Sequence, residues 1–394
     1  MVKKGLERAI IHVSGLVHYE LFLNGEKFGY DILSPGWTHY DKTTLYDTRD
    51  ITQLLNTGEN VAGLILGNGM YHVRREGRFS KFEGSYGKKR AIVEIRLEYR
   101  NGKVDIVKSD DSWKTLPGPI TYSNIYGGED HDARLEPEGW SESGFDEGDW
   151  LQAVVDTSSL KSTLKGYSFA ANPIVPIETR NPVEIRKLDG PGAYLFDFGQ
   201  NASYMPRLII SGPAGSRVRL IPGENIFPDG YISRASMGGI HRNSSWWEYI
   251  KSTDEPETWF PKFFYIGSRY IQSQVIAAER GGELPVVESL EGIIVHSAAS
   301  PIGEFETSNE LLNKIRDLVR WAQRSNMVSV LTDCPHREKL GWLEQYHLNG
   351  PAIRYEFDMT RIFTKGMLDM ADAQEDDGMV PNIAPEYTKF RGPF

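Results

Sequence analysis

The sequence predicts a multidomain protein in which two antiparallel β-sandwich modules precede the first helices of a helical domain. Short runs of alternating apolar and polar residues, separated by turns that contain Gly and Asn, recur over the first 300 residues, which is typical of β-sandwiches. Near residue 301 the apolar residues change from a period of two to helical spacing. A chain of 394 residues is also too long for one small core and suggests two or three domains.

Composition excludes several classes of function. The net charge of −10 makes nucleic acids and anionic membrane surfaces poor partners. A single cysteine excludes an internal disulfide framework, and no stretch is long and apolar enough to span a bilayer. No apolar run follows the basic start of the chain, so no signal peptide is predicted. We expect a soluble protein, periplasmic or secreted if a signal peptide precedes the chain and cytoplasmic otherwise.

The first β module is predicted over residues 1–155. Residues 9–13 and 19–23 are short β-rich runs, and an Asn-Gly pair at residues 24–25 closes the second run with a strong hairpin signal. Residues 90–99 alternate apolar and charged side chains, as a strand with one buried face requires. These runs predict a sandwich of short strands.

Polar side chains in the loops of this module have two interpretations. A carbohydrate-binding role is open for Asn68, Tyr71, Glu129 and Asp130. Hydrogen bonds that tie the loops together are favoured by roughly three to one, because most polar loop side chains serve that purpose. The acids and histidine of residues 129–132 predict no metal site, since neighbours in a strand point to opposite faces. No cofactor is predicted either.

The second β module is predicted over residues 165–300, after a linker at residues 150–167 that is rich in Ser, Thr and Lys. Residues 217–221 form an alternating strand, and turns rich in Gly separate the strands. Trp246 and Trp247 could form a sugar platform. The period of two instead predicts one ring in the core and the other at the surface.

The helical part is predicted over residues 301–394. Ser308 or Asn309 can cap its first helix, and Glu310 suits the first turn. One helical face is formed by Leu311, Leu312, Ile315, Leu318, Val319 and Ala322. A second such face follows between residues 362 and 371. Two or three helices cannot bury an apolar face on each of them, so we expect the chain to be the front part of a longer protein.

Residues 333–345 hold the highest density of groups for proton chemistry. They read Asp-Cys-Pro-His-Arg-Glu-Lys-Leu-Gly-Trp-Leu-Glu-Gln. Pro335 and Gly341 argue against one uninterrupted helix, so we expect a loop between two helices. An acid beside an arginine and near an aromatic ring suits general acid catalysis on a sugar. The alternative is a structural ion pair between Arg337 and Asp333 at a helix end.

This stretch resembles the signature of the glycoside hydrolase family 78 α-L-rhamnosidases through Asp333-Cys334-Pro335, Arg337-Glu338 and Leu340-Gly341-Trp342. Further likeness lies in residues 125–134, 197–201 and 212–215, so the resemblance covers nearly the whole chain. It implies that an (α/α)6 catalytic barrel starts at residue 301 and is truncated here. It also implies an inverting hydrolase that releases terminal L-rhamnose from glycosides or plant polysaccharides.

The resemblance also implies roles for single residues. Glu338 matches the general acid. Asp333 and Arg337 match residues that hold the rhamnose hydroxyls, and Trp342 matches an aromatic wall of the pocket. A free Glu is ionised at neutral pH, so burial or a neighbouring carboxylate must hold the proton on Glu338. Asp333 could be that neighbour, which requires Arg337 to point away from Glu338.

Three further positions complete the predicted site. Gln345 stands where many family members have an acid, and Glu344 lies one place earlier. This difference concerns how the hydroxyls are held and which sugar is accepted, so both residues are candidate substrate ligands. Asp377 resembles family residues near the pocket less specifically.

Two other functions remain open. The family's general base lies beyond residue 394, so the chain alone is expected to be inactive. A non-catalytic carbohydrate-binding or scaffold relative is one alternative, and a related barrel hydrolase for another sugar is the second. The expected partner is a rhamnose-containing carbohydrate, and the oligomeric state stays open.

Overall fold

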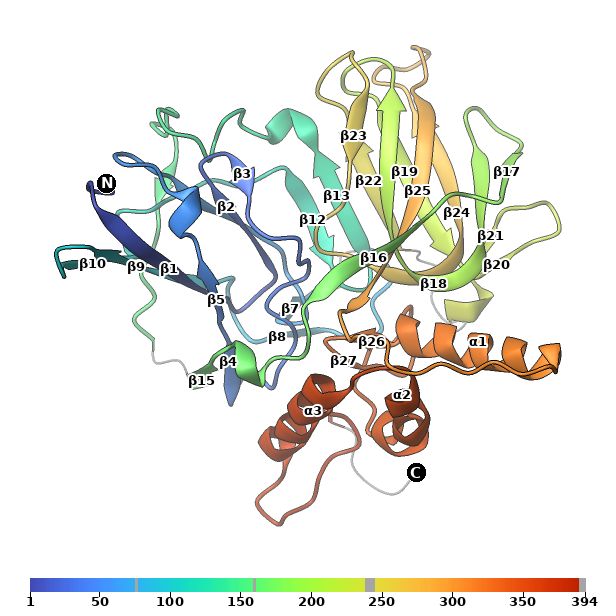
Figure 1. Cartoon of the computed structure of the whole chain (residues 1–394). Helices are drawn as coiled ribbons and strands as arrows, with labels where there is room; N and C mark the ends of the chain where they lie inside the picture. The colour runs from blue at the N-terminus through green and yellow to red at the C-terminus, as the bar shows by residue number, and fades with distance from the viewer. Residues whose placement is uncertain (75–76, 159–160, 238–244, 390–394) are drawn as a thin grey trace.

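Three regions follow one another along the chain in the computed structural model, which describes residues 1–74, 77–158, 161–237 and 245–389. A small β region carries the N-terminus, a large sheet follows, and the three α-helices of the described ranges lie below both (Figure 1). This order confirms the predicted multidomain, mostly β architecture in which helices follow residue 301. The (α/α)6 barrel stays a prediction.

Two antiparallel sheets share one core in the first region. Along β9, Val93, Ile95 and Leu97 are buried and the residues between them are less so, as predicted. Asn24 and Gly25 both have positive φ, of 50° and 90°, and join β2 to β3, which confirms the hairpin turn. The strands are β1 (Leu6–Gly15), β5 (Asp47–Asp50), β9 (Ala91–Tyr99) and β10 (Val104–Lys108), then β2 (Tyr19–Leu23), β3 (Glu26–Lys27) and β6 (Ala62–Leu66).

The large sheet has ten strands and a core of its own. Its main order is β12-β13-β22-β19-β24-β18-β25-β16, and β17 and β23 pair with β18 outside that order. The strands are β12 (Ile120–Asn124), β13 (Gly128–Asp132), β16 (Ile174–Arg180), β17 (Glu184–Lys187), β18 (Tyr194–Ser211), β19 (Arg217–Gly223), β22 (Trp246–Ile250), β23 (Glu257–Trp259), β24 (Ile266–Ile276) and β25 (Val286–Ser297).

The two β regions are joined by hydrogen bonds of this sheet. The hairpin β12–β13 lies inside the predicted first module, yet β13 pairs in parallel with β22 of the large sheet. The pairing runs from Gly128 opposite Trp246 to Asp132 opposite Ile250. The sequence pattern gave no sign of this shared sheet, because period and turn signals describe single strands and not their partners.

The adjacent tryptophans of β22 point to opposite faces, as predicted. Trp247 is fully buried, and its ring centroid lies 5.0 Å from that of Phe264. Trp246 is half-buried, and the guanidinium carbons of Arg78 and Arg219 lie 3.8 and 4.3 Å from its ring centroid. These cation–π contacts occupy the Trp246 ring, which therefore ties segments together and is poorly placed to stack on a sugar.

Short elements connect the regions. The predicted linker contributes β15, which pairs in parallel with β4 of the first region. The small pairs are β4 (Thr43–Leu45) with β15 (Thr163–Lys165), β7 (His72–Val73) with β8 (Gly84–Ser85), β11 (Lys114–Thr115) with β14 (Leu151–Gln152), β20 (Asn225–Ile226) with β21 (Ile232–Ser233), and β26 (Met327–Val328) with β27 (Val330–Leu331). The 3₁₀ turns are η1 (Thr52–Leu54), η2 (Ala133–Leu135), η3 (Tyr167–Phe169) and η4 (Ala235–Met237).

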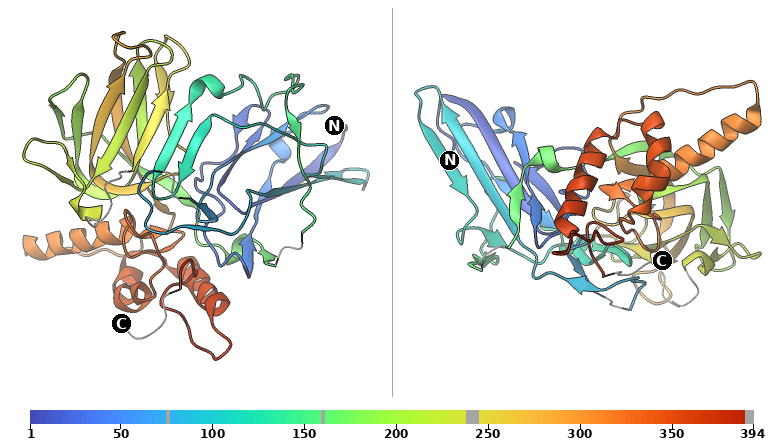
Figure 2. Two further views of the ribbon diagram at one scale, coloured as in Figure 1. Left: turned by 180° about the vertical axis from the view of Figure 1, so that it is seen from behind. Right: turned by 90° about the horizontal axis from the view of Figure 1, so that it is seen from below.

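The helical region begins with α1, whose predicted cap is confirmed. The Asn309 side chain accepts a hydrogen bond from the backbone N–H of Leu311. Seen from behind, α1 runs beneath the large sheet (Figure 2). The elements are α1 (Glu310–Ser325), the π-helical turn η5 (Gln345–Asn349), α2 (Gly350–Glu356) and α3 (Thr360–Ala373).

Polar side chains of α1 form ion pairs with the rest of the protein, whereas the apolar face of the helix is largely exposed. Arg316 and Arg320 form ion pairs with Glu356 of α2, and Arg324 pairs with Glu178 of β16. The predicted apolar face includes five side chains that are 42–70% exposed, namely Leu311, Leu312, Ile315, Leu318 and Val319. This agrees with the expectation that so few helices cannot bury an apolar face each.

One central core is shared by all three regions. It contains buried side chains from each of them, including Val17, Tyr126, Met205, Tyr265, Leu340 and Ile383. In the described ranges no helix is long and apolar enough to cross a membrane, and no group of three His, Cys, Asp or Glu side chains is placed to hold a metal ion.

Glu129 on β13 is fully buried near the junction of the two β regions. Its carboxylate accepts hydrogen bonds from the backbone N–H groups of Lys262, at 2.9 Å, and Phe263, at 2.6 Å. Burial raises the pKa of Glu129 to about 7 from an ordinary value of 4.5, and these hydrogen bonds limit the rise.

This raised pKa predicts a pH-dependent stability. Between pH 4.5 and about 7 the folded chain holds a proton on Glu129 that the unfolded chain has released, so stability falls as pH rises through this window. E129Q should make that fall shallower by up to about 3 kcal/mol. Urea unfolding at about pH 5 and about pH 7.5 measures it, with the exposed Glu147→Gln as control. If the free energy of unfolding of E129Q falls between the two pH values as much as that of the wild type, the prediction is wrong.

Candidate functional site

Residues 333–345, here called the site loop, form a closed turn. The backbone N–H of Asp333 donates to the carbonyl of Leu340, and the N–H of Leu340 donates to Asp333 Oδ1, both at 3.2 Å. The loop prediction is confirmed, with one correction. The chain enters the loop from the small hairpin β26–β27 and not directly from a helix, because a tight turn at Ser329, with φ of 67°, reverses it after α1.

A buried lysine attaches the site loop to both β regions. Lys339 is 2% exposed, and its Nζ donates hydrogen bonds to the carbonyl oxygens of Ile125, at 2.6 Å, and Tyr265, at 2.5 Å. The ammonium also lies 4.7 Å from the ring centroid of Phe264. Burial lowers the pKa of Lys339 well below its ordinary value.

Further contacts hold the loop from two sides. From the first region, the Tyr126 hydroxyl donates to the carbonyl of Glu338 at 2.7 Å. From the large sheet, the N–H of Gly267 donates to the carbonyl of Pro335 at 2.9 Å. A Cβ on Gly267 would lie 2.5 Å from Pro335 Cγ, so this close approach requires glycine. His336 Nε2 lies 3.3 Å from Glu224 Oε2.

The end of the described chain forms a third wall of the site. The N–H of Ala384 donates to the carbonyl of Gly341 at 2.9 Å, and Trp342 forms an isolated bridge with Ile383. A Cβ on Gly341 would lie 2.2 Å from the Ala384 carbonyl oxygen, so Gly341 permits this close approach of the two backbones. Trp342 is thereby fixed beside Glu338.

The carboxyl of Glu338 is held at both oxygens. Trp342 Nε1 donates to Oε2 at 3.1 Å, and Lys81 Nζ lies 3.3 Å from Oε1. Arg337 Nε is farther from Oε1, at 4.0 Å. The structure therefore brings together Glu338, Trp342 and Arg337. Lys81 was missed because it lies far away in the sequence and carries no local signal of its role.

The two carboxyls of the loop titrate as a pair. Burial raises the pKa of Asp333 to about 6, and the charge of Glu338 adds to this. Burial also acts to raise the pKa of Glu338, but hydrogen bonds from Trp342 and Lys81 outweigh it, so that this pKa lies below its ordinary value. As pH falls, Asp333 therefore takes up a proton more readily than Glu338 does.

Two sequence-based expectations need correction here. Asp333 was expected to raise the pKa of Glu338, whereas in the structure Asp333 is the group with the raised pKa, because it is the more buried of the two. Arg337 was expected to point at Asp333 or into the pocket, whereas its ion pair is with Glu338. The alternative of an Arg337–Asp333 pair is wrong for the same reason.

Three predicted positions lie at the edge of the site. Glu344 is exposed, and Gln345 is half-buried at the start of η5. Asp377 is exposed, and its carboxylate accepts a hydrogen bond from the N–H of Met379 at 2.9 Å. This bond fixes the loop that contains Asp377. A role for these three residues in sugar binding stays a prediction.

The polar loop residues of the first region serve the structure, as the favoured interpretation expected. Asn68 Nδ2 donates to the carbonyl of Ser123 at 2.6 Å, and the Tyr71 hydroxyl donates to that of Tyr86 at 3.2 Å. Asp130 pairs with Arg78. Together with the bonds of Glu129, these contacts tie loops and strands to one another.

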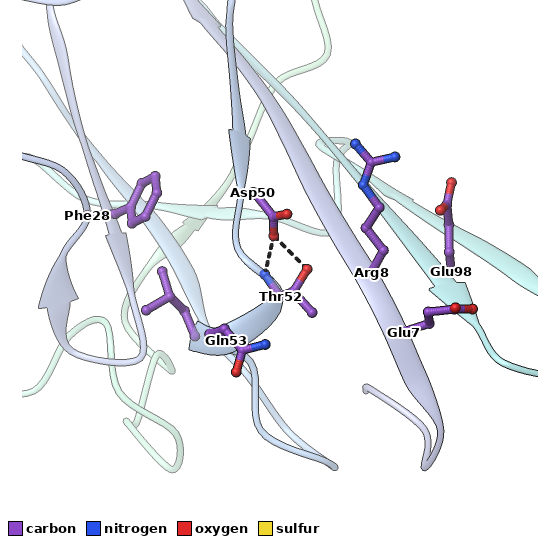
Figure 3. A pocket seen from close by; sticks show the side chains of 8 residues that line it. Glu7, Arg8, Phe28, Asp50, Thr52, Gln53 and Glu98 are labelled. Atoms are coloured by element: carbon purple, nitrogen blue, oxygen red, sulfur yellow. Dashed lines mark hydrogen bonds between the residues drawn. The ribbon is translucent and has the colours of Figure 1, made fainter.

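An open hollow of about 780 Å³ lies apart from the site loop, on the first region. Figure 3 shows Asp50 hydrogen-bonded to Thr52 among the side chains that line it. Its lining residues are Glu7, Arg8, Phe28, Asp50, Thr52, Gln53, Leu54 and Glu98. No predicted site residue lines it, so the hollow does not change the choice of site.

Comparisons with family models match nearly the whole chain in three consecutive pieces. Residues 4–175 match the α-L-rhamnosidase N-terminal domain. Residues 187–296 match the bacterial α-L-rhamnosidase concanavalin-like domain, and residues 300–393 match the bacterial α-L-rhamnosidase 6 hairpin glycosidase domain.

Curated relatives and solved structures agree with these matches. An α-L-rhamnosidase of Formosa agariphila is 32% identical over 374 residues, which are 94% of this chain and 38% of that protein. One of Streptomyces avermitilis is 32% identical over 386 residues, 97% of this chain and 36% of that protein. The chain thus spans well under half the length of these relatives.

Two solved structures cover 98% of this chain. The α-L-rhamnosidase of Dictyoglumus thermophilum has a TM-score of 0.88 at 32% identity, and the chain covers 42% of it. The α-L-rhamnosidase of Streptomyces avermitilis, complexed with L-rhamnose, has a TM-score of 0.88 at 31% identity, and the chain covers 36% of it.

The contact between Gly267 and Pro335 gives a test of how the large sheet supports the site loop. G267A would place a Cβ 2.5 Å from Pro335 Cγ, so the loop must shift. We expect a loss of about 1–3 kcal/mol in the free energy of unfolding, together with a shift of the indole NMR signal of Trp342. Gly118→Ala is the control, because a Cβ there meets no atom within 4 Å. If the two variants show the same free energy of unfolding and the same Trp342 indole signal, this contact does not support the site loop.

Proposed function

We propose that this chain, which belongs to the bacterial α-L-rhamnosidase family, carries the acid and the sugar-binding loop of a glycoside hydrolase that releases terminal L-rhamnose. The observation that supports this most is the Glu338 carboxyl, which is held between the indole of Trp342 and the ammonium of Lys81. Such a fixed carboxyl beside an aromatic ring suits proton delivery to a glycosidic oxygen.

In this proposal Glu338 is the general acid of an inverting hydrolase. It donates a proton to the glycosidic oxygen while a base on the opposite face of the sugar activates water. Asp333 and Arg337 hold the rhamnose hydroxyls, and Trp342 forms a wall of the sugar pocket.

Protonation must shift from Asp333 to Glu338 before Glu338 can act as the general acid. In the free chain Asp333 takes up a proton more readily than Glu338 does. A sugar hydroxyl that donates a hydrogen bond to Asp333 favours the ionised form of that residue. Because the two groups are coupled, ionisation of Asp333 favours protonation of Glu338. Bound sugar would also exclude water from Glu338, which acts in the same direction. Substrate binding would thus place the proton where the reaction uses it.

The role of Glu338 is tested with two leaving groups in a form of the enzyme that turns over substrate. E338Q should slow substrates with a poor, alcohol-type leaving group by about two to four orders of magnitude, since Gln has no proton to donate. Substrates with an activated aryl leaving group should lose much less, because that group departs without a proton. Steady-state kcat/KM on both substrates measures the difference.

The exposed Glu147→Gln, outside the site loop, is the matched control and should leave both rates nearly unchanged. Equal losses on the two substrates in E338Q, or no loss at all, would make Glu338 a structural residue. A selective loss in E344Q would instead identify Glu344 as the acid.

A further inference from the structure

Lys81 comes from the first β region and reaches the site loop from outside it. It lies between the short strands β7 and β8, and its Nζ is 3.3 Å from Glu338 Oε1. The other oxygen of the carboxyl accepts the indole N–H of Trp342 at 3.1 Å. Two donors from distant parts of the chain therefore fix the plane of one carboxyl group.

The segment that carries Lys81 is anchored on both sides of it. The hydroxyl of Ser80 donates to the carbonyl of Phe82 at 2.5 Å. The ring of Phe82 packs edge-on to that of Tyr387, with centroids 6.4 Å apart, and the Tyr86 hydroxyl donates to the carbonyl of Glu386 at 3.1 Å. Lys81 itself is only 36% exposed. These contacts distinguish it from a mobile surface lysine.

In the part of the chain that the structure describes, the other groups at the Glu338 carboxyl belong to the site loop itself, and Tyr126 contacts the backbone carbonyl of Glu338. Asp333 is the coupled carboxyl, and Arg337 Nε lies 4.0 Å from Oε1 with its side chain 44% exposed. Cys334 Sγ accepts the backbone N–H of Glu338 at 3.4 Å. Lys81 is thus the nearer of the two cations, and it is the one that the site loop does not supply.

We propose that Lys81 is a positioning residue for Glu338: it holds the carboxyl in place and stabilises its ionised form, so that the first β region takes part in the acid step. The proposal rests on the function proposed above. When Glu338 gives its proton to the glycosidic oxygen, the bond from that oxygen to the sugar breaks and its electron pair stays on the departing alcohol. Glu338 then carries a negative charge 3.3 Å from the Lys81 ammonium. Lys81 therefore strengthens the acid.

This assignment can be tested without turnover. Trp342 donates to Glu338, so its indole N–H signal in a sample labelled with ¹⁵N-Trp should move with pH as Glu338 titrates. W342F identifies the signal, E338Q should remove the Glu338 step, and D333N should separate the contribution of Asp333. In K81M we expect the Glu338 midpoint to move to higher pH, because a cation that favours the carboxylate is gone.

Because K81R keeps a positive charge at this position, its Glu338 midpoint should stay near the wild-type value. Lys88→Met is the matched control, since Lys88 is exposed on the same segment. A midpoint in K81M that equals the wild-type value, with the other indole signals unchanged, would overturn the proposal. So would an equal shift in K88M.

A second readout links the proposal to catalysis in a form that turns over. The falling limb of the profile of kcat/KM against pH should move to higher pH in K81M, by about as much as the NMR midpoint, because Glu338 stays protonated to higher pH. Absence of rhamnose release in every form would sink the proposed function, yet the NMR midpoint would still decide the role of Lys81. A moved midpoint with an unmoved rate profile would overturn the catalytic part of this inference.

Discussion

A buried ammonium group is the interaction on which the site depends. Lys339 is the loop residue next to Glu338. It donates to the carbonyl of Ile125, in the turn of the hairpin β12–β13 that the predicted first module contributes to the large sheet, and to the carbonyl of Tyr265, just before β24. Burial of a cation without a carboxylate partner is expensive, and two main-chain oxygens and an aromatic ring compensate it here. Since both carbonyls must be in place, the loop geometry depends on the correct association of three regions.

This dependence explains why the β regions cannot be treated as supports for a separate helical site. Tyr126 and Lys81 of the first region contact Glu338 at its carbonyl and its carboxyl. Gly267 and Glu224 of the large sheet contact the other end of the loop. The candidate acid is therefore assembled by tertiary contacts, and the helices contribute little to its immediate surroundings.

Sequence reasoning succeeded where the signal is local. The Asn24-Gly25 turn and the Asn309 cap follow from the conformations that single residues prefer, and the opposite faces of the two tryptophans follow from strand period. It failed where contacts join distant segments. Lys81 gives no local signal, and the spacing of Asp333 and Glu338 cannot reveal which carboxyl is the more buried. The pKa order of that pair was therefore predicted in the wrong direction.

The parallel pairing of β13 with β22 has a consequence for how such proteins change in evolution. Two units joined only by a linker can be recombined with other partners as intact blocks. Here a new N-terminal unit acquired by recombination would have to supply a strand that pairs with five consecutive positions of β22. It would also have to supply a lysine that reaches the carboxyl of Glu338. The N-terminal unit should therefore be inherited together with the unit that carries the site loop, and its divergence should follow that of the loop.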